Sequence, residues 1–322
     1  MIANVQDLER VRVLARRSAA VGWLSWLLLL LTTTSDSHET ELIHKIMFFA
    51  VLVIVPLGLS LVTAGEQSIS AILYRAAVLV QPAAAVITIV SFFFEKGLLS
   101  ALLSAVWLVV SGLVALLGLS RFTSRGFFPL YESSVDAGLL YLPVAGGWLI
   151  TYRLGVQPFD YGETIVLLTV VHFHFAGFAA PIIAGLTGKM LATTKHPPGR
   201  LYVFIVFAIV AAMPLVAAGI TFSPSIGLVG TLLLSVGLVM LAVLTVGRVV
   251  PAIPSLSGRL LLLIAAFSSC TAMLLACLYS YSLVAHILIL RIPTMAMTHG
   301  LLNAFGFATC SLLAWSTINA KS

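Results

Sequence analysis

Residues 200–220, RLYVFIVFAIVAAMPLVAAGI, begin with one arginine and then contain no charged side chain. A helix needs about 20 apolar residues to cross the hydrocarbon core of a bilayer, so this run predicts a transmembrane helix. The rest of the chain repeats the pattern, and ten such runs are predicted in all: 18–34, 44–64, 72–94, 97–120, 134–153, 163–188, 200–220, 225–249, 258–282 and 294–316.

The composition agrees with a membrane protein. Of the 322 residues, 61% are hydrophobic and only 9% are charged, whereas a soluble domain is about one quarter charged. We therefore predict an all-α, polytopic bundle of about ten spans. Residues 18–316 form its single transmembrane domain, between a cytoplasmic N-terminal tail, 1–17, and a short cytoplasmic C-terminal tail, 317–322.

The basic residues orient the predicted spans. With a cytoplasmic N-terminus, only four of the 17 Lys and Arg residues fall on the outer side: Lys45, Lys96, Arg153 and Arg291. Basic residues are retained on the cytoplasmic face of membrane proteins. This asymmetry accounts for the net charge of +6 without a nucleic-acid partner, and it favours a bacterial inner membrane with both termini cytoplasmic.

The sixth predicted span carries two histidines in the stretch VVHFHFAGFAAP, 170–181. At about 100° per residue, His172 and His174 point about 200° apart on a regular helix, so they cannot both bind one metal. Pro181 leaves the Gly177 carbonyl without its helical donor and predicts a kink. In one interpretation a single histidine, for which we choose His174, lines a cavity while the other bonds to a neighbouring helix. In a second, a local bulge in the helix brings the two rings together. In a third, both histidines bond to neighbouring helices.

The tenth predicted span carries a polar and small stripe of His299, Asn303, Gly306 and Cys310. These residues share one helix face, which should contact protein and not lipid. One interpretation is close packing with a bond between His299 and Asn303. The other places Asn303 near the depth of the two histidines of the sixth span, where the polar groups can meet.

The start of the fifth predicted span carries two carboxylates. Glu132 and Asp136 lie four residues apart on one helix face, and the closeness of two carboxylates favours one of them holding a proton for acid catalysis. The alternative is a helix-capping role, with pairing to Arg75 or Arg121. Five further residues near these spans are predicted to contact the substrate: Gln81, Tyr141, Trp148, Thr169 and Phe178.

Three segments together resemble a known family. ESSVDAGLLYLPVAGGW at 132–148, VHFHFAGFAAPIIAGL at 171–186 and THGLLNAFGF at 298–307 resemble the YndJ-like family of bacterial multi-pass membrane proteins. The resemblance runs through most of the chain and implies one shared site. That site would contain Asp136, His172, His174, His299 and Asn303, and the resemblance does not say what it does.

Three functions fit these residues, because the motifs of P-loop, Rossmann, serine-hydrolase and zinc-protease enzymes are absent. The first is an acid–base enzyme, a cyclase, isomerase or hydrolase of a lipophilic small molecule. Asp136 or Glu132 would donate a proton, His172 or His174 would accept one, and Asn303 would orient the substrate. The second is a proton-coupled transporter using the same residues. The third is a haem or metal protein with His174 and His299 as ligands; no cofactor is predicted for the first two.

Overall fold

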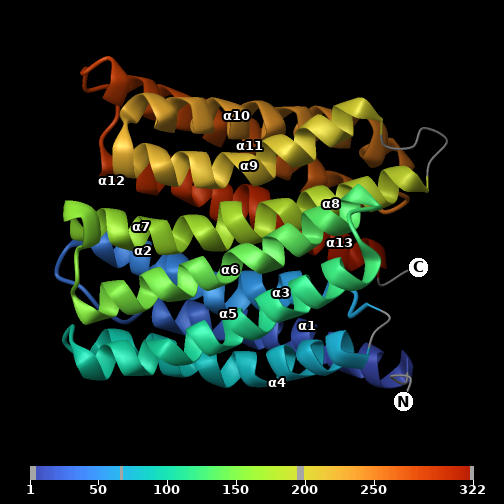
Figure 1. The fold of residues 1–322 in the computed structure, drawn as a ribbon, viewed down its shortest axis with the longest axis horizontal. Helices are drawn as coiled ribbons and strands as arrows, with labels where there is room; N and C mark the ends of the chain where they lie inside the picture. The colour runs from blue at the N-terminus through green and yellow to red at the C-terminus, as the bar shows by residue number, and fades with distance from the viewer. Residues whose placement is uncertain (1–4, 66–67, 194–198, 320–322) are drawn as a thin grey trace. The chain divides into compact units, whose positions relative to one another are not determined.

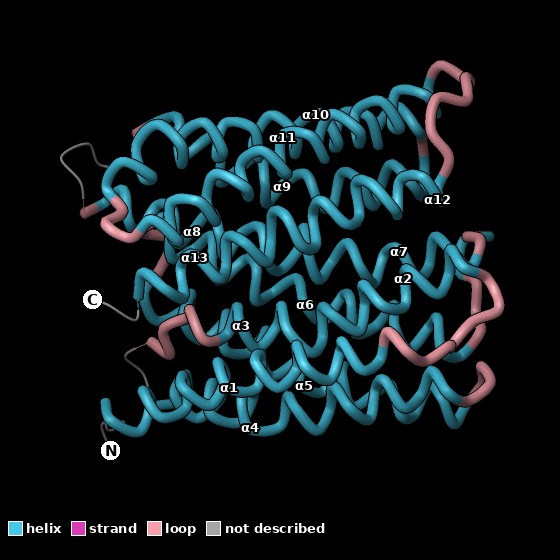
Figure 2. Tube along the Cα trace, turned by 180° about the vertical axis from the view of Figure 1, so that it is seen from behind, coloured by secondary structure: helices cyan, strands magenta, loops and turns pink. Residues whose placement is uncertain are grey.

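The computed structural model describes residues 5–65, 68–193 and 199–319, and within these ranges the chain folds into helices joined by loops (Figures 1 and 2). Nine helices of the described residues are long and apolar enough to cross a membrane. They are His38–Leu59, Ser68–Phe93, Leu98–Arg125, Leu130–Leu154, Glu163–Ala192, Arg200–Phe222, Pro224–Ala252, Leu256–Val284 and Ile292–Ile318. The all-α, multi-pass fold predicted from hydropathy is confirmed.

The first predicted span, 18–34, differs from the other nine. It belongs to helix α1, Val5–Leu29, which begins well before residue 18 and ends before residue 34. Its apolar half is short because Arg12, Arg16 and Arg17 occupy its middle turns. α1 packs closely on residues 50–54 of the next helix, where a Cβ on Gly22 would overlap the Leu52 carbonyl.

The chain divides into two compact units, which are described separately. Unit 1 contains residues 1–127 and 136–179, and unit 2 contains residues 128–135 and 180–322. The described helices of unit 1 are α1, α2 (His38–Phe49), α3 (Val55–Leu59), α4 (Ser68–Val90), α5 (Leu98–Arg125), most of α6 (Leu130–Leu154) and α7 (Glu163–His172). Those of unit 2 are α8 (Ala180–Ala192), α9 (Arg200–Phe222), α10 (Pro224–Leu244), α11 (Leu256–Val284), α12 (Ile292–Met295) and α13 (Cys310–Asn319).

Several spans are interrupted by π-helical segments. In such a segment a turn contains one extra residue, and the backbone hydrogen bonds join residues five apart and not four apart. These segments are η1 (Ala50–Ile54), η4 (Phe173–Ala179), η5 (Thr245–Val249), η7 (Ala296–Gly300) and η8 (Leu302–Thr309). η4 ends two residues before Pro181, which has no N–H to continue the regular ladder. The interruption predicted at the histidines of this span is therefore present as a π-helix.

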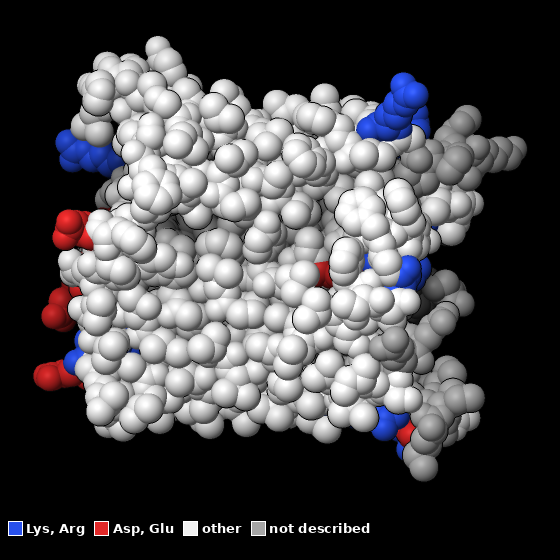
Figure 3. Space-filling view, viewed as in Figure 1, with Lys and Arg blue, Asp and Glu red and all other residues white. Residues whose placement is uncertain are grey.

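Charged side chains avoid the middle of the spans. On the face shown in Figure 3, Lys, Arg, Asp and Glu gather mainly at the two ends of the helices, and the surface between them is almost free of charge. Exposed large apolar residues lie within the long helices, among them Leu79, Val109, Phe207 and Leu274. An uncharged band between charged ends is the surface that a bilayer requires.

Candidate functional site

Asp136 forms an ion cluster near one end of unit 1. Its Oδ1 accepts a bond from Arg121 Nε at 2.6 Å, and its Oδ2 accepts one from Arg125 Nη2 at 2.7 Å. Arg121 Nη1 also donates to the backbone oxygen and the hydroxyl of Thr63. Asp136 and Arg121 are 1% and 2% exposed, so this cluster ties α5, α6 and the segment after α3 together with both carboxylate oxygens in use.

Glu132, one turn before Asp136, pairs with a basic residue of another helix. It belongs to unit 2, where its carboxylate lies 3.8 Å from Lys189 Nζ on α8. The two carboxylates predicted to act as a pair therefore have separate basic partners, with Arg121 the one anticipated for Asp136.

The two histidines of VHFHF face different surroundings. His174 is fully buried, its Nδ1 lies 2.8 Å from the Val170 carbonyl, and its Nε2 lies 3.0 Å from the indole Nε1 of Trp107. A carbonyl only accepts and an indole N–H only donates, so Nδ1 carries the proton and Nε2 is an acceptor. His172 is exposed on the surface of the chain, and its Nδ1 bonds to Leu168 O at 2.7 Å. His174 is thus the histidine that bonds to a neighbouring helix, although it was favoured for the cavity.

The structure does not bring Asp136 and His174 together. Asp136 is bound by Arg121 and His174 by Trp107, and both partners lie on α5. At about 1.5 Å per residue, these two positions are about 21 Å apart along the helix. An acid and a base so far apart do not act on one bond.

Two of the residues predicted to contact substrate bond to backbone carbonyls. The buried Gln81 amide donates to Val51 O within η1 at 2.7 Å. It therefore satisfies a π-helical interruption and not a histidine. The Thr169 hydroxyl donates to Ile165 O of its own helix at 2.8 Å.

The aromatic residues of the predicted substrate set serve as packing. Phe178 is fully buried in unit 1. The ring of Tyr141 lies 6.0 Å from that of Phe173, and Trp148 stacks on Tyr161 at 5.8 Å. Tyr141 and Trp148 therefore contact different aromatic neighbours.

In unit 2, His299 and Asn303 form a local bond. Asn303 Nδ2 lies 3.1 Å from His299 Nε2, and His299 Nδ1 bonds to Ala272 O of α11 at 2.9 Å. Gly306 packs against Ser268, also on α11, where a Cβ would overlap the serine hydroxyl. The stripe therefore faces protein. His299 and Asn303 lie in unit 2, whereas Asp136, His172 and His174 lie in unit 1.

Sequence reasoning missed a second polar group of unit 1, which we call the His44 cluster: Thr34, Glu41, His44, Lys45 and Tyr152. His44, 2% exposed, has Nε2 at 2.7 Å from the Tyr152 hydroxyl and Nδ1 at 2.9 Å from Thr34 Oγ1. The Thr34 hydroxyl donates to Glu41 Oε2 at 2.8 Å, and Lys45 Nζ lies 2.5 Å from Glu41 Oε1. Since Thr34 gives its hydrogen to Glu41, its oxygen accepts from His44 Nδ1–H.

Further charges surround this cluster. Arg153 is 3% exposed, and its Nη2 donates to the carbonyls of Ser91 and Phe94 at the end of the α4 span, at 2.7 Å each. Lys96 pairs with Glu163, and its Nζ lies 4.3 Å from the centre of the Tyr152 ring. The cluster therefore joins the starts of α2 and α7 to the ends of the α4 span and α6.

A signal for this cluster was present in the sequence. Lys45, Lys96 and Arg153 are three of the four basic residues that fall on the outer side under the predicted orientation. Positive charges that violate the usual asymmetry need local partners, and the structure supplies those partners in one place. The three outer basic residues, taken together, therefore indicate a polar cluster near Lys45, and His44 is the residue next to it.

The metal or haem alternative concerns the arrangement of the described histidines, cysteines and carboxylates. They contain no group of three or more His, Cys, Asp or Glu arranged to hold a metal ion. His174 and His299, the ligands of the metal alternative, each use both ring nitrogens in hydrogen bonds.

Comparisons with known proteins agree on a family. The profile of the family described as YndJ-like protein matches residues 45–307, well over half of the chain. The uncharacterized membrane protein YndJ of Bacillus subtilis (strain 168) is 28% identical over 216 residues. This match covers 67% of the chain but only 38% of the Bacillus protein, so the chain corresponds to part of that relative. No solved structure matches the chain.

Proposed function

We propose, on the premise that this chain belongs to the YndJ-like family, that it is a proton-coupled transporter of a small molecule. The chain is a multi-pass membrane protein, and ionisable groups buried in spans are costly and commonly mark proton or ion pathways. The activity and the substrate are part of the proposal, as is the location in a bacterial cell membrane with cytoplasmic termini.

The observation that carries the proposal is the hydrogen bonding of His44. Tyr152, its partner at Nε2, has a hydroxyl that both donates and accepts. A proton from water can therefore bind at Nε2, whereupon the new N–H donates to the Tyr152 oxygen. The Tyr152 O–H bond stays intact, and its hydrogen turns away from Nε2, drawn by the negative charge of Glu163. No bond of the imidazole is lost, and the cluster gains one positive charge.

The charges around His44 are mixed. The acidic groups are Glu41 and Glu163, and the basic groups are Lys45, Lys96 and Arg153. A further positive charge repels the three basic groups and is attracted by the two carboxylates. Proton uptake therefore changes the electrostatic balance of a cluster that joins several spans. We propose that this change alters the conformation of unit 1.

We propose that the Asp136 cluster holds the opposite end of α6 to its neighbouring helices. Asp136 and Tyr152 both lie on α6, about 24 Å apart along its axis, and each joins α6 to neighbouring spans. Charged networks at both ends of one helix suit a transporter that opens at one end at a time. An acid–base enzyme receives less support, because Asp136 and His174 have their polar atoms in use and lie far apart.

The experiment is proton movement in proteoliposomes that contain a trapped pH-sensitive dye. Pools of small metabolites are added under a pH gradient of either direction. We expect wild-type protein to move protons with at least one pool, and His44→Gln to reduce the rate about tenfold or more. His38→Gln, an exposed histidine at the start of the same helix, is the matched control and should retain the rate.

Two outcomes would count against the proposal. Wild-type protein that moves protons with none of the pools would overturn transport. The second outcome is measured by mass spectrometry of the metabolites inside and outside the same vesicles. A metabolite that is chemically converted without entering the vesicles would indicate an enzyme and not a transporter.

A further inference from the structure

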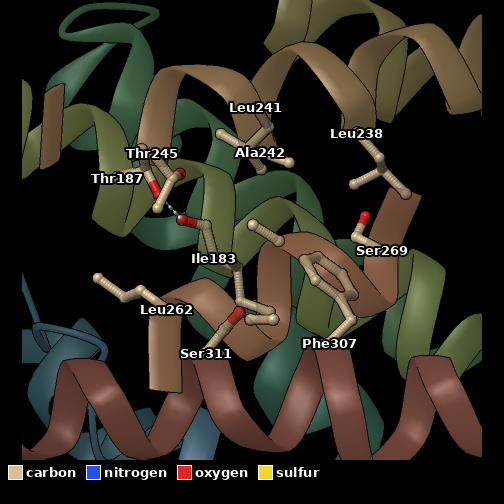
Figure 4. A pocket seen from close by; sticks show the side chains of 12 residues that line it. Ile183, Thr187, Leu238, Leu241, Ala242, Thr245, Leu262, Ser269, Phe307 and Ser311 are labelled. Carbon is tan, nitrogen blue, oxygen red and sulfur yellow. Dashed lines mark hydrogen bonds between the residues drawn. The ribbon is translucent and has the colours of Figure 1, made fainter. Parts of the chain in front are cut away.

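Unit 2 contains a small cavity that is not part of the proposed proton site. It is lined by α8, α10 with the adjoining η5, α11, and η8 with α13 (Figure 4), and its volume is about 20 Å³. Four hydroxyl-bearing residues from these helices line it, and the other lining residues are apolar: Thr187, Thr245, Ser269 and Ser311.

The unusual member of this lining is Ser269. It is 1% exposed, and its Oγ has no hydrogen-bond partner among the described residues. Other hydroxyls of α11 bond to their own helix, since Thr271 donates to Phe267 O and Ser282 to Tyr279 O. In Figure 4 the Ser269 hydroxyl points away from α11, toward Leu238 and into the cavity.

The size and chemistry of the cavity limit what it can hold. A buried hydroxyl without a partner is unfavourable in an apolar interior. A water molecule needs roughly 10–15 Å³ of such space and two to four polar partners. This cavity meets the first condition. For the second it offers four hydroxyl oxygens, of which that of Thr187 already donates its hydrogen to Ile183 O at 2.9 Å and can only accept a further bond. Organic ligands occupy pockets of about 300 Å³ or more. A hard cation takes about six oxygen ligands, more than a mainly apolar lining supplies.

We infer that this cavity is a binding site for one or two water molecules, held by Ser269 together with hydroxyls of the neighbouring helices. The water satisfies the Ser269 hydroxyl, which has no partner among the described residues. It also lies beside two interruptions of the spans, because Thr245 begins η5 and Ser311 follows η8 closely. Buried water is a common means of satisfying polar groups at such interruptions in membrane helices.

The test compares Ser269→Ala with the wild type by thermal unfolding in nanodiscs. If water is bound, the alanine variant removes one of its partners and should lower Tm by about 2–4 °C. If the cavity is dry, the same change removes an unpaired hydroxyl and should raise Tm, which would overturn the inference. Ser282→Ala, on the same helix and 4% exposed, controls for a serine whose hydroxyl already has a partner.

A direct readout separates hydration from other effects on stability. Ala265 and Ala266 line the cavity, so ¹³C-labelled alanine methyl groups should show cross-relaxation with water in the wild type. Ser269→Val fills the space and removes the hydroxyl, and it should abolish these signals. Their absence in the folded wild type would overturn the inference, whatever the outcome for proton transport.

Discussion

His44 and His174 are both buried in unit 1, and each uses both ring nitrogens in hydrogen bonds, yet their partners give them different chemistry. At Nε2, His44 faces a phenol and His174 faces an indole. A phenol can exchange donor for acceptor, whereas an indole N–H can only donate. Protonation at Nε2 would keep both bonds of His44, but it would set two N–H groups of His174 and Trp107 against each other.

This difference shows that burial and hydrogen bonding alone do not identify a proton site. The conspicuous motif, HFHF, contains the histidine that is locked in one neutral tautomer. The histidine that we propose as the proton site lies in ELIHKI, 41–46, a stretch without an unusual pattern. What distinguishes them is the residue across the helix interface, which the local sequence does not contain.

The largest effect on stability is expected from Trp107→Phe, which removes the hydrogen bond from the indole to His174 Nε2. The change removes the only donor to Nε2 and part of a fully buried ring, so it should lower the free energy of unfolding by about 2–4 kcal/mol. Reversible unfolding in mixed micelles measures this. The ¹⁵N spectrum of the histidine rings should also show His174 becoming able to bind a proton.

Trp148→Phe is the matched control for that variant. Trp148 is only partly buried and stacks on Tyr161 near the end of α6, so its loss should cost about 1 kcal/mol or less. Equal destabilisation by the two variants would mean that ring volume, and not the bond to His174, determines the effect.

The fold was largely predictable from the sequence. Nine of the predicted spans correspond to helices of the structure, because a run such as 200–220 has one stable state in a bilayer, a helix with every backbone group paired. The bounds of α1 were less predictable. Arg12, Arg16 and Arg17 lie between its first turns and its apolar second half, so hydropathy detects only the second half. Its position depends on contacts such as Gly22 against Leu52, which hydropathy does not encode.

The polar contacts were much less predictable. The pairing of Asp136 with Arg121 was among the alternatives, since both lie at span ends on the same predicted side. The pairing of His174 with Trp107 was not, because two residues 67 positions apart meet only through the rotation of each helix about its axis. The π-helical segment η4 shifts that rotation further, so a regular helical wheel cannot give it.

A smaller effect is expected from Tyr152→Phe, which tests the other side of the comparison. The ring is kept, but His44 Nε2 loses its donor, so the free energy of unfolding should fall by about 0.6–2 kcal/mol, as for other hydrogen bonds between membrane helices. Proton movement should fall with it, since Nε2–H would have no oxygen to donate to. Tyr281→Phe, on an exposed tyrosine of α11, should change neither quantity, and normal proton movement by Tyr152→Phe would remove the reversible bond from the mechanism.

The smallest effect is expected from His38→Gln. His38 is exposed at the first position of α2 and lies before the buried part of that helix. Because the side chain is exposed, its replacement should change the free energy of unfolding by no more than about 0.5 kcal/mol. Calorimetry of proton uptake should give the same number of protons for this variant as for the wild type, and fewer for His44→Gln. If His38→Gln lost the uptake instead, the proton would bind at the surface, and the distinction between the two buried histidines would have no bearing on function.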